Sequence, residues 1–361
     1  MAYLVLLALA ALDAAGYSII APVVPEIGDQ TGAGPGVMGA LVAGFAVGQA
    51  VGYPLAGRGI QRRHAVGVLL ASLALIVIGD LGFVAGGGLP VYFPARLLQG
   101  IGAGGLWIGV CFAVLERYPG EEFRRLTGIL GMYSVGAIAG PAMAAVGGIR
   151  GPFLIHLGAV LVLGAALTSL GAGEPVPVGS DRSALRSSGF WLASAGILLV
   201  ALGLGTFDGP LPLHFAEELS QAQISALYVG SAVVAGVAAT ASGRLPPRLI
   251  LGAATVLIPL GIALAGLTDT VPVWLVAAGL AGLGVGIGEA GALGVLLDTI
   301  GTERIVLAMV VWSQIWAIGY LAGPAAGGGV AQALGFGAIG LVPLVASLLV
   351  VASFLRGARP A

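Results

Sequence analysis

Residues 95–109 read ARLLQGIGAGGLWIG, an apolar stretch crowded with glycine that carries Arg96 and Gln99 near its start. A guanidinium is costly in such surroundings and normally faces a protected interior where it has a partner. The rest of the chain explains the surroundings, because 58% of its 361 residues are hydrophobic and only 9% are charged. So few charges cannot cover a soluble domain of this length, and the sequence therefore predicts a membrane protein.

Long apolar stretches recur along the whole chain. A helix needs about 20 apolar residues to cross a bilayer, and the stretches that qualify are 3–25, 37–56, 65–87, 90–115, 126–147, 152–171, 189–212, 223–242, 249–267, 271–297, 305–332 and 337–355. The predicted fold is therefore all-α, a polytopic membrane protein with twelve transmembrane helices. The longest polar stretch, 173–188, predicts a cytoplasmic linker between an N-terminal six-helix bundle, 1–172, and a C-terminal one, 189–361.

The two halves repeat in sequence. At a spacing of 182 or 183 residues the matching positions are Leu98 with Leu280, Gly100 with Gly282, Gly102 with Gly284, Gly104 with Gly286, and Gly140–Pro141 with Gly323–Pro324. Chance matching among 63 glycines is the alternative, but Leu115–Glu116 also recurs as Leu297–Asp298. A duplicated unit predicts two pseudo-symmetric bundles and is typical of transporters, whose substrate binds near the midplane between the halves.

The arginines predict how the helices are oriented. With a cytoplasmic N-terminus, Arg150 alone falls outside, Arg96 lies within a helix, and the other arginines all fall on the cytoplasmic side. Positive charge is enriched in cytoplasmic loops. The sequence therefore predicts a multi-pass protein of the cell inner (plasma) membrane with both termini cytoplasmic.

Several function classes lack their motifs. A net charge of −1 gives no reason to expect a nucleic-acid partner, and the single cysteine, Cys111, does not suggest a metal site. The chain has no H-E-x-x-H and no G-x-S-x-G, so we expect no catalytic residues, no bound metal, no cofactor and no enzyme. Gly100, Gly102 and Gly105 fit G-x-G-x-x-G only by composition, because a dinucleotide site needs that motif after a strand.

Three motifs carry a family resemblance. RLLQGIGAGG (Arg96–Gly105) resembles the helix-4 motif R-x-x-Q-G-x-G of the major facilitator superfamily. Gly136, Gly140 and Pro141 match the antiporter motif of helix 5. Arg58 and Arg62 match the motif of the helix 2–3 loop, where Gly57 replaces the usual aspartate.

The resemblance is to the twelve-helix drug/proton antiporters of that superfamily. Within them it is closest to the vesicular amine transporter-like branch, which Leu12–Ile27, Gly282–Asp298 and Met309–Phe336 resemble. The resemblance implies two six-helix bundles, alternating access and a monomer that exchanges protons for a small-molecule substrate.

Four ionisable residues, Asp13, Arg96, Asp208 and Glu289, fall within predicted spans. Three carboxylates beside one arginine cannot all stay ionised cheaply in a low dielectric, so at least one is expected to take up a proton near neutral pH. That behaviour suits a carboxylate that binds a proton and a cationic substrate in turn. The resemblance assigns proton coupling to Arg96, and the alternative is a structural arginine that caps carbonyl groups of a neighbouring helix.

The other acids also have a structural alternative. Asp13 can instead fix an unwound region before Pro22, and Asp208 can be a solvated acid of the outer vestibule. Asp80 is expected in water near the outer end of its helix, and His156 is expected near the membrane interface with its hydrogen bonds satisfied. The pairs Gly140–Pro141 and Gly323–Pro324 are expected to let helices bend during transport. The residues expected to line a pocket are Tyr17, Gln49, Gln99, Tyr133, Trp312, Gln314 and Trp316.

The sequence therefore predicts a secondary active transporter that works by alternating access. The leading hypothesis is proton-coupled efflux of lipophilic or cationic small molecules, with protons and the lipid bilayer as further partners. Transport of a neutral metabolite, such as a sugar or an amino-acid derivative, stays open, because the acid typical of amine transporters on helix 11 is replaced around Ser313–Gln314. A membrane sensor on the same fold is the third alternative.

Overall fold

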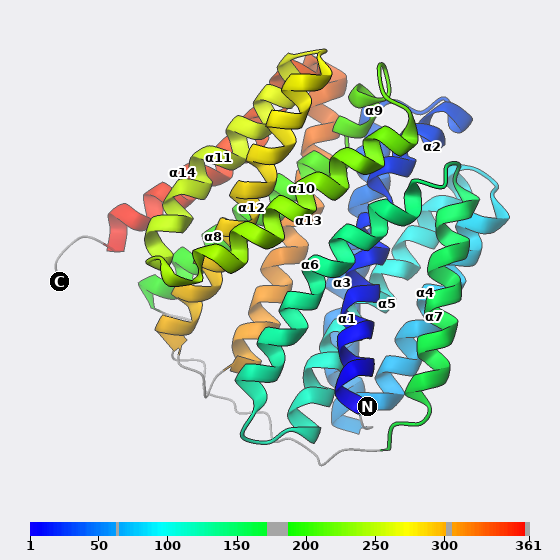
Figure 1. The fold of residues 1–361 in the computed structure, drawn as a ribbon, viewed down its shortest axis with the longest axis vertical. Helices are drawn as coiled ribbons and strands as arrows, with labels where there is room; N and C mark the ends of the chain where they lie inside the picture. Colours follow the sequence, from blue (N-terminus) through cyan, green and yellow to red (C-terminus); the bar gives the residue numbers. More distant parts are fainter. Residues whose placement is uncertain (63–64, 172–186, 301–304, 358–361) are drawn as a thin grey trace. The chain divides into compact units, whose positions relative to one another are not determined.

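The computed structural model describes residues 1–62, 65–171, 187–300 and 305–357, and all regular structure within them is helical (Figure 1). The helices are α1 (Ala2–Ser18), η1 (Ala21–Val23), α2 (Val24–Thr31), α3 (Pro35–Arg62), α4 (Ala65–Ala85), α5 (Leu89–Arg117), α6 (Glu122–Ala144), α7 (Arg150–Leu167), α8 (Ser188–Asp208), α9 (Leu211–Phe215), α10 (Gln221–Ala241), η3 (Ser242–Arg244), α11 (Pro247–Leu267), α12 (Val271–Ile300), α13 (Ile305–Leu334), η5 (Phe336–Ala338) and α14 (Leu341–Gly357). Most of the expected linker, 173–188, lies outside the described residues.

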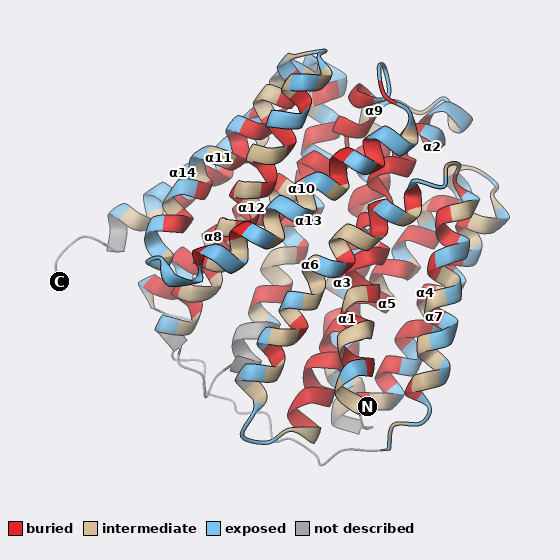
Figure 2. Ribbon diagram, in the orientation of Figure 1, coloured by how far each residue is buried: buried red, intermediate tan, exposed pale blue. Residues whose placement is uncertain are grey.

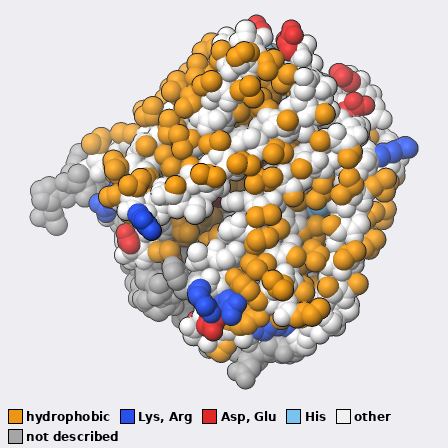
Figure 3. All heavy atoms as spheres, viewed as in Figure 1, with side chains coloured by type: hydrophobic (Ala, Val, Ile, Leu, Met, Phe, Trp, Pro, Cys, Tyr) orange, Lys and Arg blue, Asp and Glu red, His pale blue; other side chains and the backbone are white. Residues whose placement is uncertain are grey.

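Among the described residues, eleven helical stretches are long and apolar enough to cross a membrane. The 30-residue helix α13 completes the twelve expected spans. On the face shown in Figure 3, apolar side chains cover wide areas and charged side chains are few. Buried and exposed positions alternate along most helices in Figure 2, because each helix turns one side toward its neighbours. The predicted all-helical membrane fold is therefore present.

Contacts divide the chain into two compact units. Unit 1 comprises Met1–Ala33, Gly44–Pro177 and Leu219–Val229, and unit 2 comprises Gly34–Ala43, Val178–Glu218 and Gly230–Ala361. In unit 1, α1 packs on α5, α6 and α7, and α4 packs on α5 and α7. In unit 2, α8 packs on α12, α13 and α14, and α11 packs on α12 and α14. The same pairs of helices therefore meet in both units, as a duplication requires.

Equivalent glycines make the same close contacts between helix backbones in both units. A Cβ on Gly100 would lie 2.0 Å from the carbonyl oxygen of Phe45, and one on Gly282 would lie 2.3 Å from that of Ser231. One turn later, a Cβ on Gly104 would meet the carbonyl oxygen of Gln49 at 2.8 Å. Only glycine allows two helix backbones to approach this closely. The repeated glycines therefore act as the contact surface between paired helices in each unit.

The glycine–proline pairs lie where a neighbouring helix ends. Gly140 packs against Ser18 at the end of α1, where a Cβ would meet Ser18 Oγ and the Ala15 carbonyl oxygen at 2.2 and 2.5 Å. Gly323 packs in the same way on Leu202 and Thr206 of α8. Helices α6 and α13 continue through Pro141 and Pro324. Their role as hinges stays a prediction.

One expected loop is helical. Arg58 and Arg62 were expected between two spans, but α3 extends to Arg62 and includes both. The boundary prediction was wrong because the apolar stretch ends at residue 56, whereas the backbone hydrogen-bond pattern continues for more than a turn into polar sequence. Apolar length reports where a lipid-facing segment ends, and a helix can extend beyond it.

Candidate functional site

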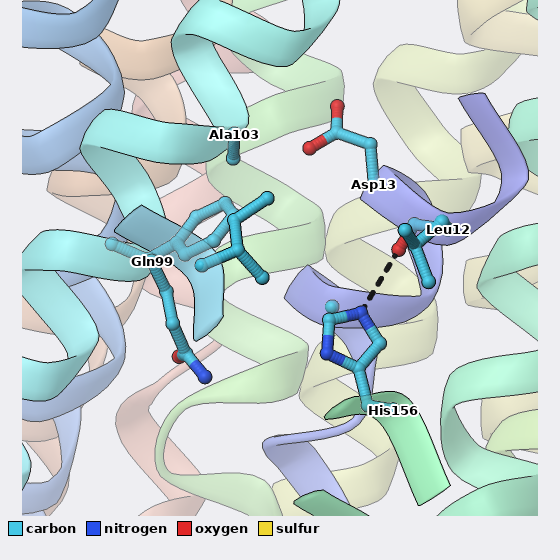
Figure 4. A pocket seen from close by; sticks show the side chains of 8 residues that line it. Leu12, Asp13, Gln99, Ala103 and His156 are labelled. Atoms are coloured by element: carbon cyan, nitrogen blue, oxygen red, sulfur yellow. Dashed lines mark hydrogen bonds between the residues drawn. The ribbon is translucent and has the colours of Figure 1, made fainter. Parts of the chain in front are cut away.

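Asp13 lies in the middle of α1 and is 4% exposed. Its Oδ2 accepts a hydrogen bond from the Tyr133 hydroxyl of α6, and its Oδ1 has no hydrogen-bond partner among the described residues. The side chain lies at a narrow gap that is also lined by Phe45, Gln99 and His156. In Figure 4, Asp13, Leu12 and His156 lie on one side, opposite Gln99 and Ala103. One oxygen of this buried carboxylate therefore has no hydrogen-bond partner among the described residues.

Arg96 is fully buried on α5 and holds the end of α1. Its Nη1 donates to the Gly16 carbonyl oxygen at 3.1 Å and its Nη2 to that of Tyr17 at 3.0 Å. Its guanidinium carbon also lies 4.3 Å from the centre of the Phe45 ring, a cation–π distance. A helix leaves its last carbonyl groups without backbone donors. This geometry is the carbonyl-capping alternative, and it adds a fixed positive charge beside the helix that carries Asp13.

Arg96 is also linked to a polar chain across unit 1. Its Nη1 donates to Gln99 Oε1 at 3.2 Å, and Gln99 Nε2 donates to Asp80 Oδ1 at 2.7 Å. The other Asp80 oxygen, Oδ2, lies 2.8 Å from His156 Nδ1. The expected position of Asp80 in water was wrong, because its side chain is 0% exposed. Both ring nitrogens of His156 have partners, as expected, and its position at the membrane interface stays a prediction. Position near a helix end suggested exposure, and only packing of α4 against α5 and α7 shows that each residue provides the other's partner.

The acids of unit 2 have different surroundings. Asp208 is 3% exposed at the end of α8, and its Oδ2 accepts a hydrogen bond of 2.9 Å from the Tyr320 hydroxyl of α13. The alternative of a solvated acid was therefore wrong. Glu289 lies half-buried on α12. Asp208 is held by a tyrosine, as Asp13 is in unit 1.

The expected pocket-lining residues divide between the units. Gln49 is buried on α3, with no hydrogen-bond partner for its Oε1 among the described residues. Tyr133 contacts Asp13, whereas Tyr17 contributes its backbone carbonyl to Arg96. On α13, Trp312 is buried, and Gln314 and Trp316 are half-buried. The aromatic residues of α13 therefore differ in burial, and Tyr320 is committed to Asp208.

A group of metal-binding residue types also occurs in unit 2, although the sequence suggested none. His214, Glu217 and Asp269 each bring one ligand atom within 4.8 Å of the others. The carboxylates are 61% and 79% exposed, and they approach opposite nitrogens of the ring, Nδ1 at 3.6 Å and Nε2 at 3.4 Å. One ion cannot use both nitrogens of a single imidazole, so this group is a poor metal site.

Two matches to one family model cover nearly the whole chain. Residues 6–207 and 193–361 each match the model described as Major Facilitator Superfamily. The chain belongs to the Major Facilitator Superfamily. Its multi-pass helical architecture is the fold of that superfamily, as the sequence motifs predicted. The drug/proton antiporter family and the amine transporter-like branch within the superfamily stay predictions.

Curated members of the superfamily match parts of the chain. Over 176 residues it is 27% identical to the uncharacterized MFS-type transporter YfiU of Bacillus subtilis (strain 168), a match covering 47% of this chain and 33% of that protein. Multidrug resistance protein 2 of the same organism is 29% identical over 159 residues, 43% of this chain and 39% of that protein. The MFS-type efflux pump elcC of Phaeosphaeria nodorum is 42% identical over 77 residues, 21% and 14% of the two chains. The matched part of the chain thus spans about two fifths or less of the length of each relative.

Proposed function

We propose that this protein is a secondary active transporter that exports lipophilic or cationic small molecules in exchange for protons by alternating access. The observation that carries the proposal is the Asp13 carboxylate, which is buried in mid-membrane sequence and has one oxygen without a donor among the described residues. Membership of the superfamily supports transport. The names of two relatives, a multidrug resistance protein and an efflux pump, support export of small molecules.

The chemistry follows from the cost of a buried charge. An ionised carboxylate in a membrane interior is unfavourable by several kcal/mol unless a cation or hydrogen bonds compensate it. The Tyr133 hydroxyl supplies one hydrogen bond to Asp13. Either a proton or a cationic substrate can neutralise the remaining charge, and the two compete for the same carboxylate. Competition between two ligands at one site gives exchange when access alternates.

Arg96 completes this proposed site as a fixed charge. It cannot lose its proton, and its donors hold the Gly16 and Tyr17 carbonyl groups three and four residues beyond Asp13. We infer that it fixes the broken end of α1, so that neutralising Asp13 changes the electrostatic balance at that break. In unit 2, we propose Asp208 and Glu289 as the further proton or substrate acids.

The proposal extends to membrane placement and movement. We infer a position in the inner membrane with both termini cytoplasmic, because all arginines but Arg150 and Arg96 fall on one side of the predicted spans. We infer bundles bounded at 1–172 and 189–361, a linker at 173–188 and a monomeric protein. Gly140–Pro141 and Gly323–Pro324 are the proposed hinges.

The test is transport by the purified full chain in proteoliposomes. An imposed pH gradient is expected to drive uptake of a fluorescent quaternary ammonium dye. The variant Asp13→Asn is expected to lose this uptake to the level of empty liposomes, whereas Asp29→Asn, which removes an exposed acid of α2, is expected to retain it. Equal gradient-driven uptake by wild type and Asp13→Asn would show that Asp13 is not the coupling acid. Flux of labelled neutral sugars without flux of any cation would favour the neutral-metabolite alternative.

A further inference from the structure

Asp80 and His156 form a buried hydrogen-bonded pair that the proposed transport cycle does not use. Their side chains are 0% and 2% exposed, and Asp80 Oδ2 lies 2.8 Å from His156 Nδ1. The second ring nitrogen, Nε2, lies 3.2 Å from the Leu12 carbonyl oxygen of α1 (Figure 4). The pair therefore joins α4, α7 and α1 at the residue that precedes Asp13.

Counting donors and acceptors fixes how many protons the pair holds. The Leu12 carbonyl group can only accept, so His156 Nε2 must carry a proton. An ionised carboxylate can also only accept, so a second proton must lie between Nδ1 and Asp80 Oδ2, on one atom or the other. The remaining Asp80 oxygen accepts from the Gln99 amide nitrogen, and this orientation is set because Gln99 Oε1 accepts from Arg96. All contacts are satisfied only when the pair holds one proton more than a neutral imidazole beside an ionised carboxylate.

We propose that Asp80 and His156 together form a proton-binding site that fastens α1 to α7 at Leu12. Loss of the proton places a nitrogen lone pair against either the Asp80 carboxylate or the Leu12 carbonyl oxygen, so one of the two contacts must break. If the carboxylate contact is retained, the tie to α1 is released one residue before Asp13. The ligand of this site is a proton, and the site reports its occupancy to the helix that carries the proposed coupling acid.

Two glycines make room for the His156 ring and the Gln99 side chain. A Cβ on Gly16 would lie 3.0 Å from His156 Nε2, so any side chain at that position would crowd the ring away from α1. A Cβ on Gly79 would lie 2.5 Å from Gln99 Cγ, so glycine is also needed where α4 meets Gln99. The ring and the amide reach their partners because both neighbouring positions lack side chains.

The surrounding charges link this site to Asp13. Among the ionisable groups on the neighbouring helices are Asp13 on α1, Arg96 on α5, Tyr133 on α6 and, at the start of α7, Arg150. With the pair protonated, the charges of Arg96 and an ionised Asp13 cancel, and the pair itself is neutral. Losing the proton leaves a net buried negative charge, which uptake of a proton by Asp13 would remove. Occupancy of the two sites is therefore expected to be coupled, and this consequence alone rests on the proposed function.

The proton itself is the first thing to measure. The chain has three histidines, so the variant His64→Gln/His214→Gln with ¹⁵N-histidine in lipid nanodiscs reports on His156 alone. At about pH 7 we expect either two protonated ring nitrogens or an infrared band of a protonated carboxyl group that Asp80→Asn abolishes and Glu26→Gln, at an exposed acid, does not. A ring with one unprotonated nitrogen and no such band overturns the site. If the double variant does not accumulate, difference spectra of the labelled wild-type chain and His156→Gln give the same result.

The tie to α1 is tested by backbone hydrogen exchange. In the wild-type chain, exchange of the α1 amides near Leu12, corrected for intrinsic rate, is expected to accelerate once the proton is lost. His156→Gln removes the titrating ring, so it is expected to abolish this pH dependence. Asp13→Asn is expected to keep the pH dependence but to move it to lower pH, because the charge of Arg96 is then no longer balanced by Asp13. Exchange that does not respond to loss of the proton overturns the tie. Absence of proton-driven dye flux with an intact signature would refute the proposed function and leave this site standing.

Discussion

The two units use one packing scheme around different interiors. Gly136 and Gly319 pack on the carbonyl oxygens of Ala11 and Leu198, which makes Val200 on α8 the equivalent of Asp13 on α1. By the same comparison of glycine contacts, the polar residues of unit 1 and their equivalents in unit 2 are Asp80 with Ile262, Arg96 with Ala278, and Gln99 with Ala281. All four equivalents are buried and apolar.

The difference separates what builds the scaffold from what supplies its chemistry. The glycines recur in both units because backbone approach between paired helices depends on them. The polar residues do not recur, so the fold does not need them. The acids of unit 2, Asp208 and Glu289, occupy positions whose equivalents in unit 1 are Ala21 and Trp107. Each unit has therefore placed its ionisable groups independently on a shared frame.

Moving an acid between equivalent positions is expected to have the largest effect. Val200 is fully buried, and Val200→Asp would place a carboxylate where the equivalents of Arg96 and Gln99 are alanines. An unpartnered buried charge costs about 4 kcal/mol. We expect loss of folded protein, measured as the monodisperse fraction in size-exclusion chromatography.

The reverse exchange is the control for this comparison. Asp13→Val removes a buried charge and leaves Tyr133 half-buried with access to other partners, so it is expected to fold and to lose proton-driven transport. A Val200→Asp chain that is as stable as wild type would contradict the claim that the interior of unit 2 is apolar.

The scaffold shared by the two units was easier to predict from the sequence than the polar contacts of unit 1. Helix number and the repeat were predictable because apolar length and glycine spacing are local properties of the chain. The Asp80–His156 pair was missed, since its members are 76 positions apart and Asp80 was expected to contact water at the end of its span. The sequence also placed Arg96 in a helix correctly, but only the structure shows that it donates to the carbonyl groups of Gly16 and Tyr17.

Substituting the repeated glycines is expected to have the next largest effect, and an equal one in both units. Gly100→Ala would place a Cβ 2.0 Å from a backbone oxygen of the neighbouring helix, and Gly282→Ala would place one at 2.3 Å from the corresponding oxygen in unit 2. Because backbone cannot rotate away, we expect about 3 kcal/mol of destabilisation in each case, measured as a lowered midpoint of thermal unfolding in detergent.

Gly279→Ala provides the control on the same helix as Gly282. Its added Cβ would meet nothing within 4 Å, so we expect no loss of stability. If Gly279→Ala and Gly282→Ala were equally destabilising, the cost would belong to helix α12 in general and not to its contact with α10.

Replacing Arg96, whose equivalent in unit 2 is Ala278, is expected to have an intermediate effect. Arg96→Lys keeps the charge but loses the planar fork that reaches the Gly16 and Tyr17 carbonyl oxygens together. Loss of one charged hydrogen bond predicts about 2 kcal/mol of destabilisation. Ala278→Ser, at the equivalent position of unit 2, is the matched control and is expected to change little. A fully stable Arg96→Lys chain would show that charge alone, without the fork, holds the end of α1.

The smallest effect is expected for a substitution in the solvent-exposed ion pairs of unit 1. Glu121, before α6, forms ion pairs with Arg124 and Arg125. Hydrogen bonds from Arg124 and then Arg125 hold the pKa of Glu121 below its usual value. Because the folded chain favours the ionised carboxylate, the stabilisation is present above the pKa of an unpaired glutamate and is lost as pH falls through the lowered value.

Glu121→Gln is therefore expected to lower the thermal midpoint slightly at neutral pH and to match wild type in acid. Added salt should shrink the difference, because Glu121 is 45% exposed and its ion pairs are screened. A difference between Glu121→Gln and wild type that persists in acid and in high salt would mean that the side chain acts through packing. The claim that the exposed charges of unit 1 are screened by solvent, unlike the buried ones, would then be wrong for Glu121.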